Sequence, residues 1–118
     1  MNLESTKCPC CGRNEMDQVF IKKLMMAEKP CPFHFVISSG FRCEKHNATL
    51  PGSSPTSSHL KGLAVDITVA NSWERLHVIH ALLQGAFERI GIGKDFVHVD
   101  DDMAKPKPVM WLYLWSKS

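Results

Sequence analysis

The stretch Ser58-His59-Leu60-Lys61-Gly62-Leu63-Ala64-Val65-Asp66 places a histidine shortly before an aspartate. Residues 62–69 alternate in polarity, which predicts a half-buried strand. Three apolar side chains share one face of this strand: Leu63, Val65 and Ile67. Asp66 lies on the opposite face with Ala64, whose small side chain leaves space in front of the sheet. His59 comes just before the strand, so we expect His59 and Asp66 to face one cleft.

A second predicted strand, Phe96–Asp100, carries another histidine on its polar face. Alternation turns its two valines toward the core and His98 the other way. If the two strands are neighbours, His59, Asp66 and His98 converge on the cleft. Two imidazoles and one carboxylate suit Zn²⁺ and leave a fourth position for water, which is the arrangement of catalytic zinc sites.

Spacing alone leaves a simpler alternative open, because histidines and aspartates at such distances also occur by chance. The other histidines illustrate this. His34 falls on a predicted strand, and His77 and His80 fall on a predicted helix. We expect these three to be core-edge or surface residues rather than metal ligands.

The rest of the chain predicts two helices and further short strands. Apolar residues recur at helical spacing over 16–28 and from Asn71 or Ser72 to about Glu88. The faces expected to be buried comprise Met16, Val19, Phe20, Leu24 and Ala27 in the first helix and Leu76, Ile79, Leu83 and Phe87 in the second. Strands are expected over 33–38, 90–93 and 109–115, and a long loop over 42–58. This order predicts an α+β fold, with a small antiparallel sheet and helices packed on one side.

Length and composition fit a single domain over 1–118, with the cysteine-rich segment 1–15 as part of it. The chain has 118 residues, of which 44% are hydrophobic and 22% charged, and this balance excludes disorder. A net charge of +2 is too small to indicate nucleic acid as a partner. No apolar run reaches the roughly 20 residues of a spanning helix, so we expect no membrane insertion. The polar first residues lack the apolar core of a signal peptide, so we expect synthesis in the cytoplasm, and a monomer.

Three segments resemble motifs of one enzyme family. The quoted stretch resembles the motif His-x-x-Gly-x-Ala-x-Asp, and His98-Val99-Asp100 resembles the later His-x-Asp. Ser39-Gly40-Phe41-Arg42, followed by Asn47, resembles a Ser-Gly-Tyr-Arg…Asn segment. Together they resemble the zinc D-Ala-D-Ala carboxypeptidase and L-alanyl-D-glutamate endopeptidase family, whose fold is shared with the hedgehog signalling domain. The resemblance runs over nearly the whole chain.

The resemblance implies a catalytic Zn²⁺ held by His59, Asp66 and His98, and peptidoglycan stem peptides as substrates. It implies that Arg42 anchors a substrate carboxylate, which a guanidinium can hold with two parallel hydrogen bonds. Ser58 could bind substrate or orient His59. D-Ala-D-Ala and L-Ala-D-Glu cleavage use the same zinc chemistry, and the sequence does not separate them. Short chains of this kind resemble phage or prophage members that reach murein during lysis.

Two carboxylates are candidates for the general base that a zinc peptidase needs. Asp95 stands three residues before His98, and this spacing resembles the catalytic carboxylate of the family's endopeptidases and dipeptidases. Asp95 reaches the cleft only if the turn at Gly93-Lys94 curls it over the site. Asp100 is the competitor, because it shares a strand face with His98. We favour Asp95 as the base and expect Asp100 to orient a ligand or substrate.

The cysteines suggest a second metal site. Cys8-Pro-Cys-Cys-Gly12 has the form of a zinc knuckle, and Cys43-Glu-Lys-His46 supplies two further ligand types. Cys8, Cys11, Cys43 and His46 could therefore close a structural site. The alternatives are Cys31 as a competing ligand, a Cys11–Cys43 disulfide, or free thiols. The knuckle also motivates a rival function, that of a non-catalytic zinc-binding interaction module. A further alternative is a degenerate family member that binds cell wall without catalysis.

Overall fold

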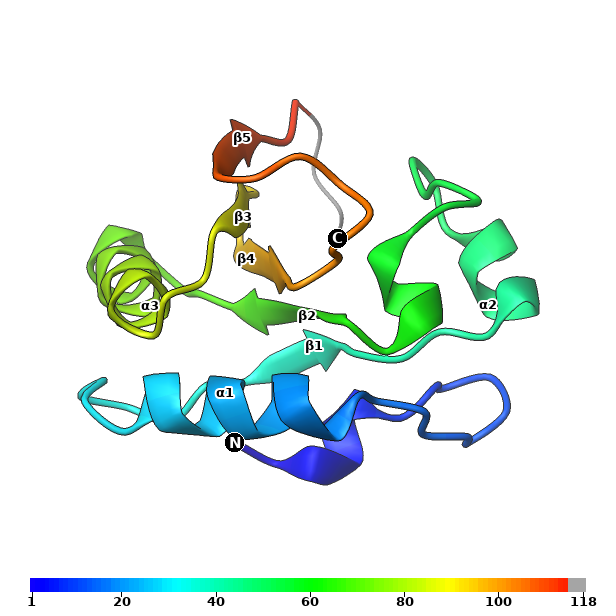
Figure 1. Ribbon diagram of the computed structural model, residues 1–118, viewed down its shortest axis with the longest axis horizontal. Coiled ribbons are helices and arrows are strands. Elements are labelled where there is room, and N and C mark those ends of the chain that lie inside the picture. The colour runs from blue at the N-terminus through cyan, green and yellow to red at the C-terminus, as the bar shows by residue number, and fades with distance from the viewer. Residues whose placement is uncertain (115–118) are drawn as a thin grey trace.

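The computed structural model describes residues 1–114 and shows an α+β fold, as predicted (Figure 1). Within this range, the strands form a single sheet in the order β1 (Ile37–Ser39), β2 (Ala64–Thr68), β4 (Phe96–Asp100), β3 (Arg89–Ile92) and β5 (Val109–Leu112). The α-helices are α1 (Gln18–Glu28), α2 (Glu44–Thr49) and α3 (Ser72–Gln84), and the 3₁₀ helices are η1 (Leu3–Thr6) and η2 (Ser58–Lys61).

The sheet is mixed rather than purely antiparallel. β1, β2, β4 and β3 pair antiparallel with their neighbours, but β5 pairs parallel with β3. After β4 the chain does not turn back as a hairpin. It crosses to the far edge of β3 and enters β5 with the Val109 N–H donating to the Glu88 carbonyl at 2.9 Å. The last predicted strand ends at Leu112, and residue 115 lies outside the described range.

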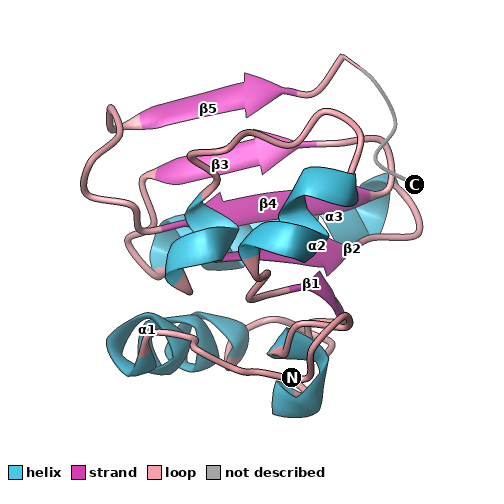
Figure 2. Cartoon of the chain, turned by 90° about the vertical axis from the view of Figure 1, so that its right-hand side faces the viewer, coloured by secondary structure: helices cyan, strands magenta, loops and turns pink. Residues whose placement is uncertain are grey.

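Helices α1 and α3 share the main core on one face of the sheet. Asp17 caps α1, since its side chain accepts a hydrogen bond from the Phe20 N–H, and the Phe20 ring meets Phe87 edge-on at 5.9 Å. The short α2 falls within the stretch predicted as a loop. It lies in front of the opposite face, with α3 behind the sheet (Figure 2). The prediction that the helices pack on one side of the sheet therefore holds for α1 and α3 but not for α2 (Figure 2).

Two predicted helix faces are partly wrong. Val19, Leu76 and Leu83 are exposed, whereas the buried residues of the helices are Phe20, Ile21, Leu24 and Ala27 in α1 and Val78, Ala81 and Leu82 in α3. The error in the buried face of α3 arises because the prediction counts Phe87 as part of the helix, whereas α3 ends at Gln84. The chain then bends through Ala86, whose φ is 65°, and carries Phe87 into the core outside the helical period.

Strands β2 and β4 are neighbours, which confirms the pairing that the predicted cleft required. Asp66 lies opposite His98, and Val65 lies opposite Val99. Val65 and Val99 are fully buried on the helix side of the sheet. The polar faces of both strands consequently point together toward the side that carries η2 and α2. No helix in residues 1–114 is long and apolar enough to cross a membrane.

Gly62 makes the turn from η2 into β2, and we expect its substitution by alanine to destabilise the fold strongly. Its φ is +69°, and a Cβ there would meet the backbone of Glu15 and lie 2.9 Å from the Met16 Cα. Gly12 has a similar φ of +75° but open space around it. We expect Gly12→Ala to lower the free energy of unfolding by about 1–2 kcal/mol, the cost of left-handed backbone alone. Gly62→Ala should lower it further, because backbone must also move.

Denaturant unfolding of both variants measures this difference directly. Equal losses in the two variants would contradict the close packing of residues 15–16 against Gly62.

Candidate metal centre

Three separate elements bring His59, Asp66 and His98 together. η2 carries His59, β2 carries Asp66 and β4 carries His98. Each of the three residues is at most 6% exposed, and one donor atom of each lies within 4.8 Å of the others. The sequence predicted this convergence from strand parity, and the predicted zinc ligands therefore share one buried site.

His59 is held with one ring nitrogen free to bind a cation. Its Nδ1 lies 2.7 Å from the Gly40 carbonyl, which can only accept, so Nδ1 carries the proton. Its Nε2 lies 3.4 Å from Asp66 Oδ1 and is buried without a hydrogen-bond partner among the described residues. Burial lowers the pKa of His59. The neutral ring then presents an unpaired Nε2 lone pair to the site.

His98 lies between two carboxylates. Its Nδ1 is 2.9 Å from Asp66 Oδ1 and its Nε2 is 2.7 Å from Asp100 Oδ2. Burial alone would lower the pKa of His98, but the hydrogen bonds to Asp100 and Asp66 outweigh burial and raise it. Burial likewise opposes ionisation of Asp66, yet the hydrogen bond and positive charge of His98 hold the pKa of Asp66 well below its usual range. Asp66 is therefore the anionic centre of the site.

These donors fit a zinc ion. Nitrogen and oxygen ligands about 2.0–2.1 Å from a tetrahedral zinc lie roughly 3.3 Å from one another. The distances from Asp66 Oδ1 to His59 Nε2 and to His98 Nδ1 are 3.4 and 2.9 Å. The buried Nε2 of His59 lacks a hydrogen-bond partner in residues 1–114, and a cation could replace the proton on His98 Nδ1.

Asp100 is engaged by groups behind the site. Its Oδ2 accepts from His98, and its Oδ1 accepts from Arg89 Nε at 2.7 Å and from the Asp102 N–H at 3.1 Å. A carboxylate that accepts from the second nitrogen of a ligand histidine fixes the ring and its tautomer. Asp100 Oδ2 contacts His98 in this way, and the bonds to Oδ1 hold the carboxylate in place, so its position suits an orienting role. Sequence reasoning did not single out Arg89.

Arg42 lies beside the three predicted ligands and is almost completely buried. Its Nε donates to Ser39 Oγ and its Nη1 donates to Asn47 Oδ1, both at 3.1 Å. Its Nη2 lies 3.7 Å from Asp66 Oδ2. Arg42 lines several cavities, two of which also border the predicted ligands. One of about 160 Å³ is also lined by His59 and His98, and one of about 470 Å³ is also lined by Ser39 and Asp66.

Ser58 is close to the site but belongs to a buried network. Its hydroxyl donates to Asp102 Oδ2 at 2.8 Å and accepts from Lys105 Nζ at 2.9 Å. Lys61 Nζ reaches both carboxylate oxygens of Asp102 at 3.0 Å. These contacts tie η2 to the loop after β4, so they support the position of His59 from behind.

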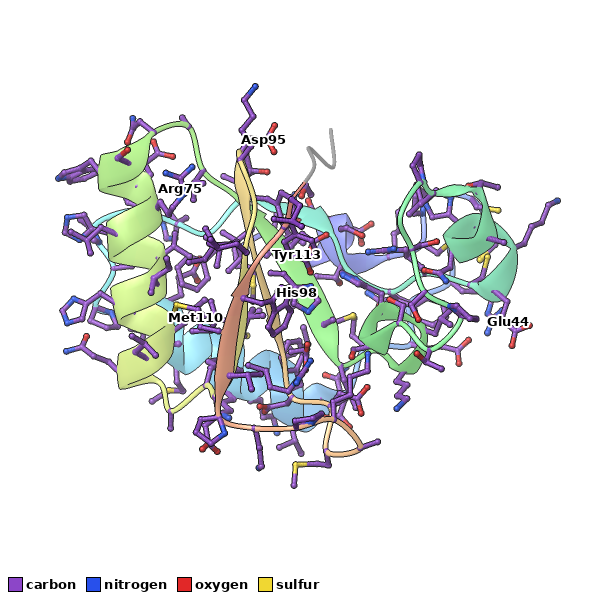
Figure 3. The ribbon with its side chains drawn as sticks, turned by 90° about the horizontal axis from the view of Figure 1, so that it is seen from above. Glu44, Arg75, Asp95, His98, Met110 and Tyr113 are labelled. Carbon is purple, nitrogen blue, oxygen red and sulfur yellow. The ribbon has the colours of Figure 1, made fainter. Side chains whose placement is uncertain are left out.

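The structure does not bring Asp95 to the site. Asp95 is exposed between β3 and β4, and its carbonyl accepts from the Val69 N–H at 3.0 Å. Figure 3 shows Asp95 well away from His98 and Tyr113, which lie together. The turn at Gly93-Lys94 does not curl over His98.

Two aromatic residues that sequence reasoning missed line the smaller cavity. The ring centroids of Trp111 and Tyr113 lie 5.5 and 6.3 Å from that of His98. Burial raises the pKa of Tyr113 to about 12, so its phenol is neutral at physiological pH. Alternation along β5 was the available signal. It places both rings on one face and leaves Met110 and Leu112 exposed.

The cysteine-rich segment forms a second group of candidate ligands. Cys8, Cys11 and Cys43 have sulfur atoms within 4.8 Å of one another, and the His46 imidazole is not part of this group. All five cysteines lie within the described residues and are free, so the alternative of a Cys11–Cys43 disulfide is not formed.

Comparison with known proteins identifies the family. The family model described as Peptidase M15 matches residues 7–100, a range that contains His59, Asp66, His98, Arg42 and most of the cysteine-rich segment. A search of curated proteins finds no match. M15 peptidases use zinc, and the buried His-Asp-His group is a donor set that suits it. By this match over most of its length, the chain belongs to the peptidase M15 family of zinc metallopeptidases.

Proposed function

We propose that this protein is a zinc-dependent hydrolase that cleaves peptide bonds in peptidoglycan stem peptides. The observation that carries the proposal is the buried cluster of His59 Nε2, Asp66 Oδ1 and His98 Nδ1, in a chain of the M15 family. A zinc ion held there would act as a Lewis acid that acidifies water and polarises a peptide carbonyl.

The chain's own residues would keep these donors in position. Gly40 fixes the tautomer of His59, and Asp100 does so for His98. Arg89 holds Asp100 in turn with a hydrogen bond of 2.7 Å. Ligands that need little rearrangement lose little orientational freedom when a metal or substrate binds. These hydrogen bonds, which hold the predicted ligands in fixed orientations, favour a catalytic site over a chance cluster of histidines.

The substrate proposal rests on Arg42 and on the aromatic wall of the cavity, which consists of Trp111 and Tyr113. Stem peptides carry free carboxylates, and the Nη2 of Arg42 lies on the side of its guanidinium that faces the predicted ligands. Trp111 and Tyr113 line the cavity beside His98 and offer apolar surface with a polar edge. We propose D-Ala-D-Ala or L-Ala-D-Glu as the bond that is cut, with access to murein gained during lysis, as in the phage-type members that the sequence resembles.

Incubation of the zinc-loaded protein with purified muropeptides, followed by mass spectrometry of the products, tests the function. The product masses identify the bond. Muropeptides that remain intact with zinc-loaded protein would overturn the hydrolase proposal and favour a non-catalytic zinc-binding module.

Removing either histidine ligand should abolish zinc binding at this site together with activity. His59→Ala and His98→Ala should each lose one zinc ion per chain, because two donors retain a metal poorly. His80→Ala is the matched control, since His80 is exposed on α3. Elemental analysis of each variant, with muropeptide turnover measured in parallel, checks this. Full zinc occupancy in both histidine variants would exclude the assigned ligands.

Arg42→Lys should weaken turnover although it keeps the positive charge. Lysine cannot reproduce the bonds to Ser39 and Asn47 together with a contact to substrate. Loss of one charge-assisted hydrogen bond corresponds to roughly a ten- to hundredfold fall in kcat/KM. Arg75→Lys, on α3, provides the control. An unchanged kcat/KM in Arg42→Lys would show that this arginine does not bind substrate.

The two carboxylates should have different kinetic signatures. Asp100→Asn should weaken zinc binding about 10–100-fold, because the amide orients His98 less well. Asp95→Asn should retain both zinc affinity and kcat, because Asp95 is exposed and lies away from His98 (Figure 3). Chelator competition and single-turnover kinetics separate the two effects.

Asp101→Asn is the control for this pair, because Asp101 forms its ion pair with Lys23. A fall in kcat of about 10²–10⁴ in Asp95→Asn would instead show that Asp95 acts as the general base. An Asp100→Asn variant with unchanged zinc affinity would argue against the orienting role.

A further inference from the structure

The cysteine cluster joins two parts of the chain that are far apart in sequence. Cys8 and Cys11 lie in the segment after η1, and Cys43 is the N-cap of α2. Their sulfur atoms lie within 4.8 Å of one another, and the Cys8 and Cys43 sulfurs are 3.7 Å apart. Thiolates about 2.3 Å from one tetrahedral zinc lie roughly 3.8 Å apart. The spacing of the thiols is therefore already close to that of ligands on one ion.

The backbone around these thiols is shaped to stabilise thiolates. The Cys43 N–H donates to Cys8 Sγ at 3.5 Å, and the His46 N–H donates to Cys43 Sγ at 3.4 Å. The backbone of Cys10 and Cys11 also donates to the Cys8 sulfur. Gly12 closes this turn, with its N–H bonded to the Cys8 carbonyl at 2.8 Å. Cys8 is fully buried, where several N–H donors would be needed to stabilise a negative sulfur.

We propose that Cys8, Cys11 and Cys43 bind a second, structural zinc ion, with Cys10 as the fourth ligand. Cys10 precedes Cys11 in the chain and lines one cavity together with Cys11 and Cys43. A site closed by four protein ligands has no position for water and is structural rather than catalytic.

Cys10 is preferred here to His46, the fourth ligand expected from the sequence. The backbone N–H of His46 is bonded to the Cys43 sulfur, but His46 lines the cavity of about 470 Å³ with Arg42 and Leu50. Neither Cys10 nor His46 belongs to the group of three thiols whose sulfurs lie within 4.8 Å of one another, so either side chain would have to turn toward the ion. A soft thiolate suits this sulfur-rich site better than an imidazole, and Cys10 lines a cavity with two of the three thiols.

This second zinc would clamp the N-terminal segment against the chain that carries Arg42. The Phe41 N–H donates to the Thr6 carbonyl at 2.7 Å, and a Cβ at Gly40 would lie 2.6 Å from the Thr6 Cα. Gly40 in turn accepts the Nδ1–H of His59. The clamp would therefore hold a backbone stretch that orients His59 and carries Arg42, without contributing a ligand to the His-Asp-His site.

Cobalt substitution tests this proposal without any measurement of activity. Co²⁺ bound to thiolates gives strong sulfur-to-metal charge-transfer absorption in the near ultraviolet, whereas cobalt bound to histidine and aspartate does not. We expect this absorption in the wild-type protein and in the double variant His59→Ala/His98→Ala. Elemental analysis should find two zinc ions in the wild type and one in the double variant.

Cysteine variants identify the ligands. Cys43→Ser should lose the charge-transfer absorption and one zinc ion, while Cys31→Ser, which alters the thiol outside the cluster, should lose neither. Absence of the absorption in the wild type would overturn the proposal even if Cys43→Ser fails to fold. Cys10→Ser should weaken the site and His46→Ala should not, and the opposite result would overturn the assignment of Cys10.

Discussion

The position of Asp66 opposite His98 in the β2–β4 pair is the constraint on which the site depends. Successive residues of a strand face opposite sides, so a slip by one residue would turn one of these side chains into the apolar core. The register is fixed from behind, because Val65, Ile67, Val97 and Val99 are fully buried against the helices. Hydrophobic burial on one face of the sheet thereby sets the polar geometry of the other.

Buried charge at this site is tolerated because each group has a partner. Asp66 faces both imidazoles, His98 faces Asp66 and Asp100, and Asp100 is paired with Arg89. A buried ion without its partner costs several kcal/mol. The guanidinium of Arg89 also lies 5.0 Å from the Trp111 ring, so the network extends to the aromatic wall of the cavity. Such coupling explains why β5, at the sheet edge, is part of the site.

The sequence predicted those features that depend on a strand's period of two. The parity of Asp66 and His98 followed from alternation, and their pairing is confirmed. Features set by long-range geometry were missed. The position of β5 beside β3 depends on a crossover, so Trp111 and Tyr113 were not linked to His98. The spacing of Asp95 from His98, which resembles that of the family's catalytic carboxylate, suggested Asp95. The conformation of the turn decides where that side chain points, and Asp95 is exposed.

The two groups of donors differ in a way that matches different tasks. The His-Asp-His group offers nitrogen and oxygen donors beside a cavity, whereas the cysteine group offers sulfur donors, of which Cys8 is fully buried. Thiolates donate much negative charge to a zinc ion and make it a weaker Lewis acid. Imidazole and carboxylate ligands leave more positive charge on the metal, which can then polarise a water or substrate at the fourth position. Residues 39–43 lie between the groups, since Gly40 contacts His59 and Cys43 contacts Cys8. One short stretch of backbone therefore couples the rigidity of the N-terminal segment to the orientation of His59.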